Sequence, residues 1–206
     1  MMEVGRVFSD PWLKWEIRLL LCVPFFHIVV MIFQGRLGSN PVETMILETG
    51  EATVHLLVAV MWISPLRVLL SRFDWPKRLL RHKRDIGVAC WIYASVHLTL
   101  YILDNLGGTL LENLQKPFIV VGLAAWILLT LLAVTSPQCM LRKLGGKRWK
   151  ALHRSVYGIA VLACFHMLLK EKSQPLSAYL HFIPLLCAET IRLGLHLRFR
   201  FQNLSS

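Results

Sequence analysis

The sequence predicts an all-α integral membrane protein, a bundle of six transmembrane helices with both termini in the cytoplasm. Of its 206 residues, 55% are hydrophobic and only 17% are charged, and the mean hydropathy is +0.54. Soluble domains carry about 25% charged residues. Apolar stretches close to the length that spans a bilayer recur along the chain, with basic residues gathered in short segments between them. The chain is therefore expected to cross a membrane repeatedly.

The first three spans are expected at about residues 17–33, 52–70 and 86–104. The polar segment before the first span has no signal-peptide cleavage site, and Trp12 and Trp15 are expected to anchor it at the membrane surface. Turn-forming residues, GRLGSNPVETMILETGE, separate the first two spans. The basic segment SRFDWPKRLLRHKRD separates the second span from the third.

The last three spans are expected at about residues 117–135, 153–169 and 178–196. The weakly charged segment NLGGTLLENLQK precedes the fourth span, and the basic segment SPQCMLRKLGGKRWK precedes the fifth. A short connection, KEKSQPL, leads to the sixth span, which ends in the basic tail RFRFQNLSS. Together the six spans form a single transmembrane domain that covers residues 1–206.

The basic residues fix the expected orientation. The two termini and the second and fourth loops hold 19 of the 23 Lys and Arg residues, whereas the other three loops hold only Arg36, Lys116, Lys170 and Lys172. By the positive-inside rule, both termini lie in the cytoplasm, and the third and fifth spans run in the same direction. The net charge of +11 therefore indicates cytoplasmic loops and a lipid environment, with no nucleic-acid partner.

Several kinds of chemistry are not expected on this chain. The five cysteines are scattered, four of them within apolar runs, and no C-x-x-C pair occurs, so they are expected to be packing residues. The sequence offers no Ser-His-Asp set, no paired acid-base carboxylates and no glycine-rich dinucleotide fingerprint. We therefore expect no bond chemistry on a substrate from this chain alone.

Two histidines mark the fifth span. His153 and His166 lie 13 positions apart, which is ~20 Å along a helix and most of a hydrocarbon core ~30 Å thick. Imidazole is a common ligand of haem iron in electron-transfer proteins, so the pair is typical of an electron path across a membrane. An ideal helix would point the two rings about 140° apart. Both reach cofactors only if the haems flank different sides of the helix or one turn is tightened. The alternative is that both are satisfied polar residues within the bundle.

His97 is the expected partner of His166. It lies ~16 Å above the cytoplasmic edge of the third span, and His166 lies ~20 Å above that of the fifth. Because these spans are parallel, the two imidazoles are expected at similar depth in the outer half, where they could ligate one haem. Unrelated core histidines remain the alternative.

The partner of His153 is less clear from the sequence. His82, Lys83 and Arg84 lie at the start of the third span, and Arg84 is a candidate for pairing with a haem propionate. Three more histidines lie inside predicted spans, where either a cofactor role or a helix–helix hydrogen bond is possible. These are His27, His55 and His181.

Short motifs along nearly the whole chain carry a family resemblance. They are LGSNPVE at 37–43, Thr49-Gly50, SPLR at 64–67, HLTLY at 97–101, Thr135-Ser136 and RKLGGKRWKALHRSVY at 142–157, with His166 beyond. In this order and spacing they resemble the MsrQ (YedZ) family of haem-binding membrane subunits, within the ferric reductase and NADPH oxidase-like transmembrane superfamily.

The resemblance implies a multi-pass protein of the bacterial inner membrane that binds one or two b-type haems. His97 and His166 would hold the outer haem and His153 an inner one. Electrons would come from the quinone pool or a cytosolic flavin reductase, FMN is a possible further cofactor, and the acceptor would be MsrP, a periplasmic molybdopterin enzyme that repairs methionine sulfoxide. The family tends to carry an Arg-Arg pair where this chain has Lys83-Arg84. The second ligand of an inner haem therefore stays open.

Two other functions also fit the sequence. A cytochrome of the same build could reduce ferric iron or another acceptor, and a non-redox transporter or scaffold could carry structural histidines. For a periplasmic partner, the natural docking face would be the outer loops at 35–51 and 106–116, including Glu43 and Glu48.

Overall fold

The computed structural model describes residues 11–105, 115–170 and 175–202, and these residues are almost entirely helical. The elements are α1 (Pro11–Leu21), α2 (Val23–Phe33), α3 (Pro41–Leu69), α4 (Trp75–Leu79), the 3₁₀ turn η1 (Leu80–His82), α5 (Lys83–Asp104), α7 (Pro117–Val134), α8 (Gln138–Leu144), α9 (Gly146–His153), α10 (Val156–Leu169) and α11 (Pro175–Gln202). No strand occurs among the described residues, so the predicted all-α class is confirmed.

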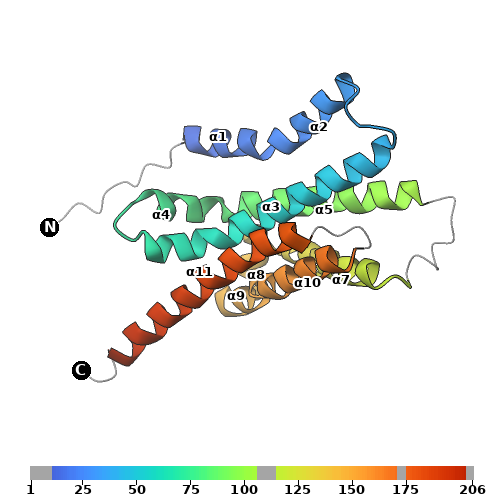
Figure 1. Ribbon diagram of the computed structural model, residues 1–206. Helices are drawn as coiled ribbons and strands as arrows, with labels where there is room; N and C mark the ends of the chain where they lie inside the picture. The colour runs from blue at the N-terminus through green and yellow to red at the C-terminus, as the bar shows by residue number, and fades with distance from the viewer. Residues whose placement is uncertain (1–10, 106–114, 171–174, 203–206) are drawn as a thin grey trace.

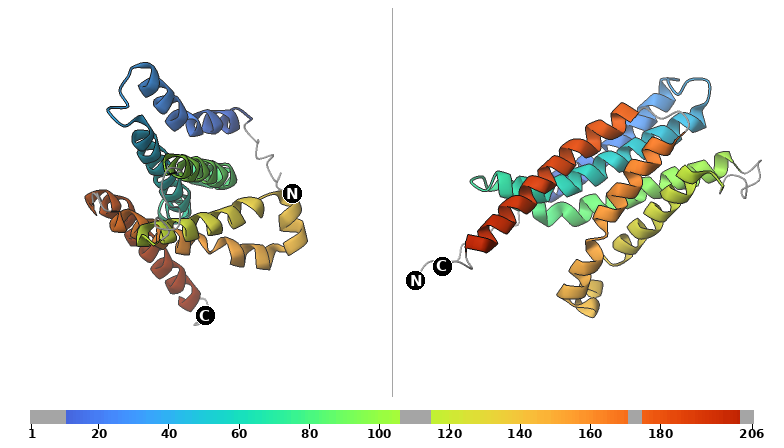
Figure 2. Two further views of the ribbon diagram at one scale, coloured as in Figure 1. Left: turned by 90° about the vertical axis from the view of Figure 1, so that its right-hand side faces the viewer. Right: turned by 60° about the horizontal axis from the view of Figure 1, so that its bottom comes forward.

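Five helical stretches are long and apolar enough to cross a membrane, and the bent pair α1–α2 makes a sixth if it is one span. α3 packs along α5, and α7 packs along α10. Figure 2 shows α1 and α2 beside the α3–α5 pair, away from α7 and α10. The predicted membrane bundle is therefore confirmed, while the side on which the termini lie stays a prediction.

The first span is two helices rather than one. A bend of 42° separates α1 from α2, because Pro24 lacks the N–H that a continuous helix would use. Tyr93 of α5 occupies the break: its hydroxyl donates to the Leu21 carbonyl at 2.9 Å and accepts from the Phe25 N–H at 3.2 Å. In an unbroken helix these two backbone groups would bond to each other. The hydroxyl thus replaces a helical hydrogen bond and ties α1 and α2 to α5.

The fifth span is also interrupted. α9 ends at His153, and α10 begins only at Val156. Between them the backbone tightens, with the Ser155 N–H bonding to the Leu152 carbonyl and the Tyr157 N–H to the Arg154 carbonyl, both three residues back. The angle expected between His153 and His166 on an ideal helix therefore does not apply.

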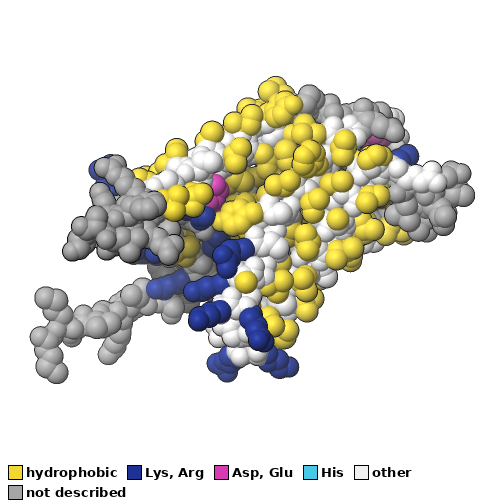
Figure 3. All heavy atoms as spheres, turned by 90° about the horizontal axis from the view of Figure 1, so that it is seen from below, with side chains coloured by type: hydrophobic (Ala, Val, Ile, Leu, Met, Phe, Trp, Pro, Cys, Tyr) yellow, Lys and Arg dark blue, Asp and Glu magenta, His cyan; other side chains and the backbone are white. Residues whose placement is uncertain are grey.

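Many of the positively charged side chains lie at one end of the bundle. α4, α8 and α9 carry exposed Lys and Arg side chains, and we call the end of the molecule where they lie the basic end. Figure 3 shows most of the visible Lys and Arg side chains toward one end of the visible face, with hydrophobic side chains over much of the remainder. In Figure 1, α4 and the end of α11 lie on the left, and the turn between α2 and α3 lies on the right with the end of α5. The exposed apolar surface between the two ends suits lipid.

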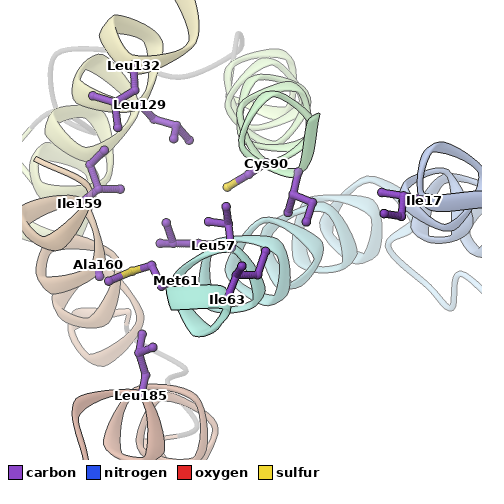
Figure 4. Packing of buried hydrophobic residues seen from close by; sticks show 12 residues of the cluster. Ile17, Leu57, Met61, Ile63, Cys90, Leu129, Leu132, Ile159, Ala160 and Leu185 are labelled. Carbon is purple, nitrogen blue, oxygen red and sulfur yellow. The ribbon is translucent and has the colours of Figure 1, made fainter. Parts of the chain in front are cut away.

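The main apolar core lies nearer the basic end. Leu57 of α3, Cys90 of α5, Leu129 of α7 and Ile159 of α10 are buried against one another (Figure 4). On each of these four helices the core residues lie on the basic-end side of the level at which His97 and His166 occur. The two halves of the bundle are thus built differently, with the aliphatic core in one and the facing pair of His97 and His166 in the other.

Candidate functional site

His97 of α5 and His166 of α10 face each other across the bundle. Their ring centroids are 6.2 Å apart, and their planes are nearly perpendicular, at 87°. Both side chains are half-buried. The two helices come from different halves of the chain and meet at the level that the sequence predicted from depth alone. The structure therefore brings together two of the three predicted ligands.

The separation suits a single metal ion between the rings. Bonds of ~2 Å from a metal to each imidazole nitrogen, with a ring radius of ~1.2 Å on either side, place two centroids ~6 Å apart. Among the described residues, no group of three or more His, Cys, Asp or Glu side chains surrounds a possible ion. Two histidines alone suit a metal whose remaining ligands belong to a macrocycle, as in a bis-histidine haem.

The other nitrogen of each ring is already engaged. Nδ1 of His97 lies 2.8 Å from the Ile46 carbonyl of α3, and Nδ1 of His166 lies 2.7 Å from the Phe118 carbonyl of α7. A carbonyl oxygen only accepts, so each Nδ1 carries the proton and each Nε2 keeps its lone pair. Metal-binding histidines in proteins are oriented by this arrangement. The sequence could not reveal these partners, because they are backbone atoms.

His153 lies apart from this pair, at the basic end. Its ring stacks on Trp149, with centroids 3.8 Å apart and planes at 23°. Its Nε2 lies 3.3 Å from Thr135 Oγ1, which itself donates to the Leu131 carbonyl, so the imidazole donates this bond. Trp149 Nε1 donates to the Thr135 carbonyl at 2.8 Å. The end of α7 thus holds both aromatic rings, and ligation through Nε2 would require His153 to leave Thr135.

A shallow cavity of about 390 Å³, wide open at the surface, lies beside His153. Its lining consists of Lys83, Trp149, Lys150, His153, Arg154, Val156 and Tyr157. Lys83 donates from Nζ to Ser64 Oγ at 2.9 Å. Arg84, the residue predicted to contact a propionate, is exposed and does not line the cavity, whereas its neighbour Lys83 does. The lining therefore presents positive charge toward any ligand.

The remaining intramembrane histidines join helices. His55 of α3 and His181 of α11 have ring centroids 4.8 Å apart, and His181 Nδ1 donates to the Ser177 carbonyl at 2.6 Å. His27 of α2 lies 3.6 Å from the carboxylate of Glu48 on α3. The sequence left such helix–helix contacts open as the alternative to a cofactor role. It did not indicate which histidines would pair.

Only part of the predicted docking face can be described. Asn40 caps α3 by accepting from the Glu43 N–H, and its amide donates to the Glu43 carboxylate. Glu48 faces His27. Of the loop at 106–116, residues 106–114 lie outside the described part of the chain.

The chain is similar to known proteins at the level of its family and of individual relatives. Residues 49–164 match the family described as ferric reductase like transmembrane component, a range that includes His97 and His153 and ends two residues before His166. The chain is 37% identical over 148 residues to the protein-methionine-sulfoxide reductase heme-binding subunit MsrQ of Herminiimonas arsenicoxydans. That alignment covers 70% of this chain and 66% of the relative, just under two thirds of its length.

These matches confirm the resemblance that the sequence motifs indicated. They agree with the helical bundle, its apolar surface and its candidate spans. The chain therefore belongs to the ferric reductase-like transmembrane family and is a multi-pass protein of the inner membrane.

Proposed function

We propose that this chain is a b-type haem-binding subunit that transfers electrons in a protein-methionine-sulfoxide reductase system. The facing pair His97 and His166 carries the proposal, because the two ring centroids lie at a separation that suits one iron and each Nδ1–H bond leaves Nε2 with its lone pair. The family and the name of the 37% identical relative support the same function.

Each ligand residue has a defined part in this proposal. A bound haem supplies a one-electron carrier. His97 and His166 would hold its iron, and ligation by two imidazoles suits electron passage. The Ile46 and Phe118 carbonyls hold the Nδ1 protons and thereby make each Nε2 a stronger donor. Stronger axial donors stabilise ferric over ferrous iron, so these bonds would lower the reduction potential.

The direction of electron flow follows from charge. We assign the basic end to the cytoplasm by the positive-inside rule. The His97–His166 pair then lies in the periplasmic half. Electrons would enter from the quinone pool or a cytosolic flavin reductase and leave to a periplasmic MsrP-like molybdopterin reductase.

A second cofactor is proposed at the basic end. The cavity beside His153 presents Lys83, Lys150 and Arg154, which complement propionate or phosphate groups. A second haem ligated by His153, or FMN, would bring an anionic group to this lining. For the haem, His153 would first exchange its Thr135 hydrogen bond for iron.

The decisive experiment is a haem assay. The full chain is expressed with ample haem supply and purified in detergent, and iron per chain is measured with a reduced-minus-oxidised spectrum. We expect at least one low-spin b-type haem per chain. A colourless protein would overturn the proposed function and leave a transporter or scaffold.

The acceptor requires a separate test, because the family itself favours ferric iron as an alternative. The reduced, haem-loaded chain is mixed in turn with a purified periplasmic molybdopterin reductase and with chelated ferric iron, and haem reoxidation is followed optically. Faster reoxidation by the molybdoenzyme supports the proposal. Faster reoxidation by ferric iron would identify a ferric reductase.

A further inference from the structure

Two glycines lie directly against the two facing histidine rings. A Cβ atom added at Gly122 of α7 would lie 2.6 Å from Nδ1 and 2.8 Å from Cε1 of His166. A Cβ added at Gly50 of α3 would lie 3.1 Å from both Nδ1 and Cε1 of His97. The first contact is closer than real Cβ atoms come to other heavy atoms, and the second is tight. Each imidazole therefore occupies space that any other residue would fill.

The same arrangement occurs twice. On α3 the carbonyl that binds the ring belongs to Ile46, four residues before Gly50, and on α7 it belongs to Phe118, four residues before Gly122. Residues four apart lie one above the other on one face of a helix. On one turn, α3 and α7 each present a carbonyl to a histidine ring, and on the next turn each presents a glycine without a side chain.

We propose that Gly50 and Gly122 are positioning residues that fix the planes of the two ligand imidazoles nearly at right angles. The inference rests on the proposed haem-binding function. The carbonyl bond sets the direction of each Nδ1–H, and the contact with the glycine backbone limits rotation of the ring about that bond. Together they hold the 87° angle between the His97 and His166 planes.

The angle has a measurable consequence. An imidazole donates electron density into the iron d orbital perpendicular to its ring. Two parallel rings raise the energy of the same orbital, whereas two perpendicular rings raise the two relevant orbitals equally. Ferric haem with perpendicular imidazoles therefore gives a low-spin electron paramagnetic resonance (EPR) signal of large g anisotropy, and parallel imidazoles give a rhombic signal. The structure predicts the first kind for the outer haem.

The test compares four alanine variants of the haem-loaded full chain. Gly122→Ala and Gly50→Ala change the proposed positioning residues. Gly158→Ala on α10 and Gly87→Ala on α5 are matched controls on the ligand-bearing helices, where an added Cβ meets nothing within 4 Å. Haem affinity, reduction potential and the EPR spectrum are measured for each.

We expect Gly122→Ala to lower haem affinity by ~10-fold or more, in the range found when groups that orient metal ligands are removed. Gly50→Ala, with its looser contact, is expected to keep the haem but to reduce the g anisotropy and shift the potential. Both controls should match the wild type.

A double-mutant cycle covers the case in which Gly122→Ala folds poorly. If the methyl group added at position 122 clashes with the His166 ring, Gly122→Ala lowers the free energy of unfolding of the haem-free chain. The same substitution then has a smaller effect on that free energy in a His166→Ala background. An equal loss of stability in both backgrounds would overturn the inference.

The outcomes separate this inference from the proposed function. A wild-type chain without haem overturns both. A haem-loaded wild type with a rhombic signal, or glycine variants indistinguishable from Gly87→Ala and Gly158→Ala, overturns the positioning role alone.

Discussion

The two candidate haem sites differ in the hydrogen bonds that their histidines make before a cofactor binds. In the His97–His166 pair, each ring has Nδ1 bound to a backbone carbonyl, and Nε2 keeps its lone pair. At the basic end, His153 uses Nε2 to bind Thr135 and lies stacked on Trp149. The His97–His166 site is thus oriented by backbone carbonyls before any cofactor binds. His153, in contrast, must give up its hydrogen bond to Thr135 before its Nε2 can bind a metal.

The strongest test of this contrast replaces the histidines one at a time. We expect His97→Ala and His166→Ala each to abolish the haem with perpendicular ligands, because a single remaining imidazole leaves one axial position empty. His153→Ala should leave that haem in place and remove at most a second one. Iron per chain and the difference spectrum report the result. Loss of all haem in His153→Ala would show that the two sites are not independent.

The next largest effect is expected from charge at the basic end. Lys83 lines the cavity beside His153, and Arg84 does not. A hydrogen bond to a charged group contributes ~1.5–3 kcal/mol, so Lys83→Gln should weaken binding of FMN by roughly 10- to 100-fold, and the loss should shrink in high salt. Quenching of flavin fluorescence on titration measures this affinity.

Arg84→Gln serves as the matched control for Lys83→Gln. Because its side chain is exposed, we expect little change in flavin affinity. If Arg84→Gln had the larger effect, the residue predicted from the sequence would be the ligand contact and the role of Lys83 would be refuted.

The smallest expected effect concerns the contact that competes with ligation. Thr135→Val removes the hydroxyl that His153 binds and leaves the Trp149 bond to the Thr135 carbonyl intact. Freed of one neutral hydrogen bond, His153 should bind an inner haem about two- to tenfold more tightly. Spectral titration with haem measures the change, and Thr130→Val, elsewhere on α7, is the control. Weaker binding would mean that Thr135 supports the ligand and does not compete with it.

The shared level of His97 and His166 along the bundle was predictable because the rise per residue of a helix is fixed. That rule matched His97 to His166 before any contact was known, and basic loops indicated that the two spans are parallel. The angle between His153 and His166 around the axis of the fifth span was not predictable, because it depends on the tightened turn between α9 and α10. The placement of Lys83, and not Arg84, at the cavity beside His153 has the same cause: neighbours on a helix face in different directions, and sequence alone does not set which faces inward.

The hydrogen-bond partners of the key side chains were the second feature that could not be predicted from the sequence. The break between α1 and α2 follows from Pro24, but the Tyr93 hydroxyl that fills it comes from a residue 68 positions away from Phe25. The carbonyls of Ile46 and Phe118 are backbone atoms that every sequence has. Such partners appear only once helices are placed side by side.

The position of the apolar core has a consequence for the life of the protein in the cell. Aliphatic side chains fasten α3, α5, α7 and α10 together near the basic end, whereas at the level of the proposed haem two imidazoles bridge them. A porphyrin gripped there adds its binding free energy to that of folding, and stabilises the native state in proportion to the logarithm of its supply. Cells short of haem should accordingly contain less of this polypeptide, because quality-control proteases remove chains in which the half that holds His97 and His166 is not stabilised by haem.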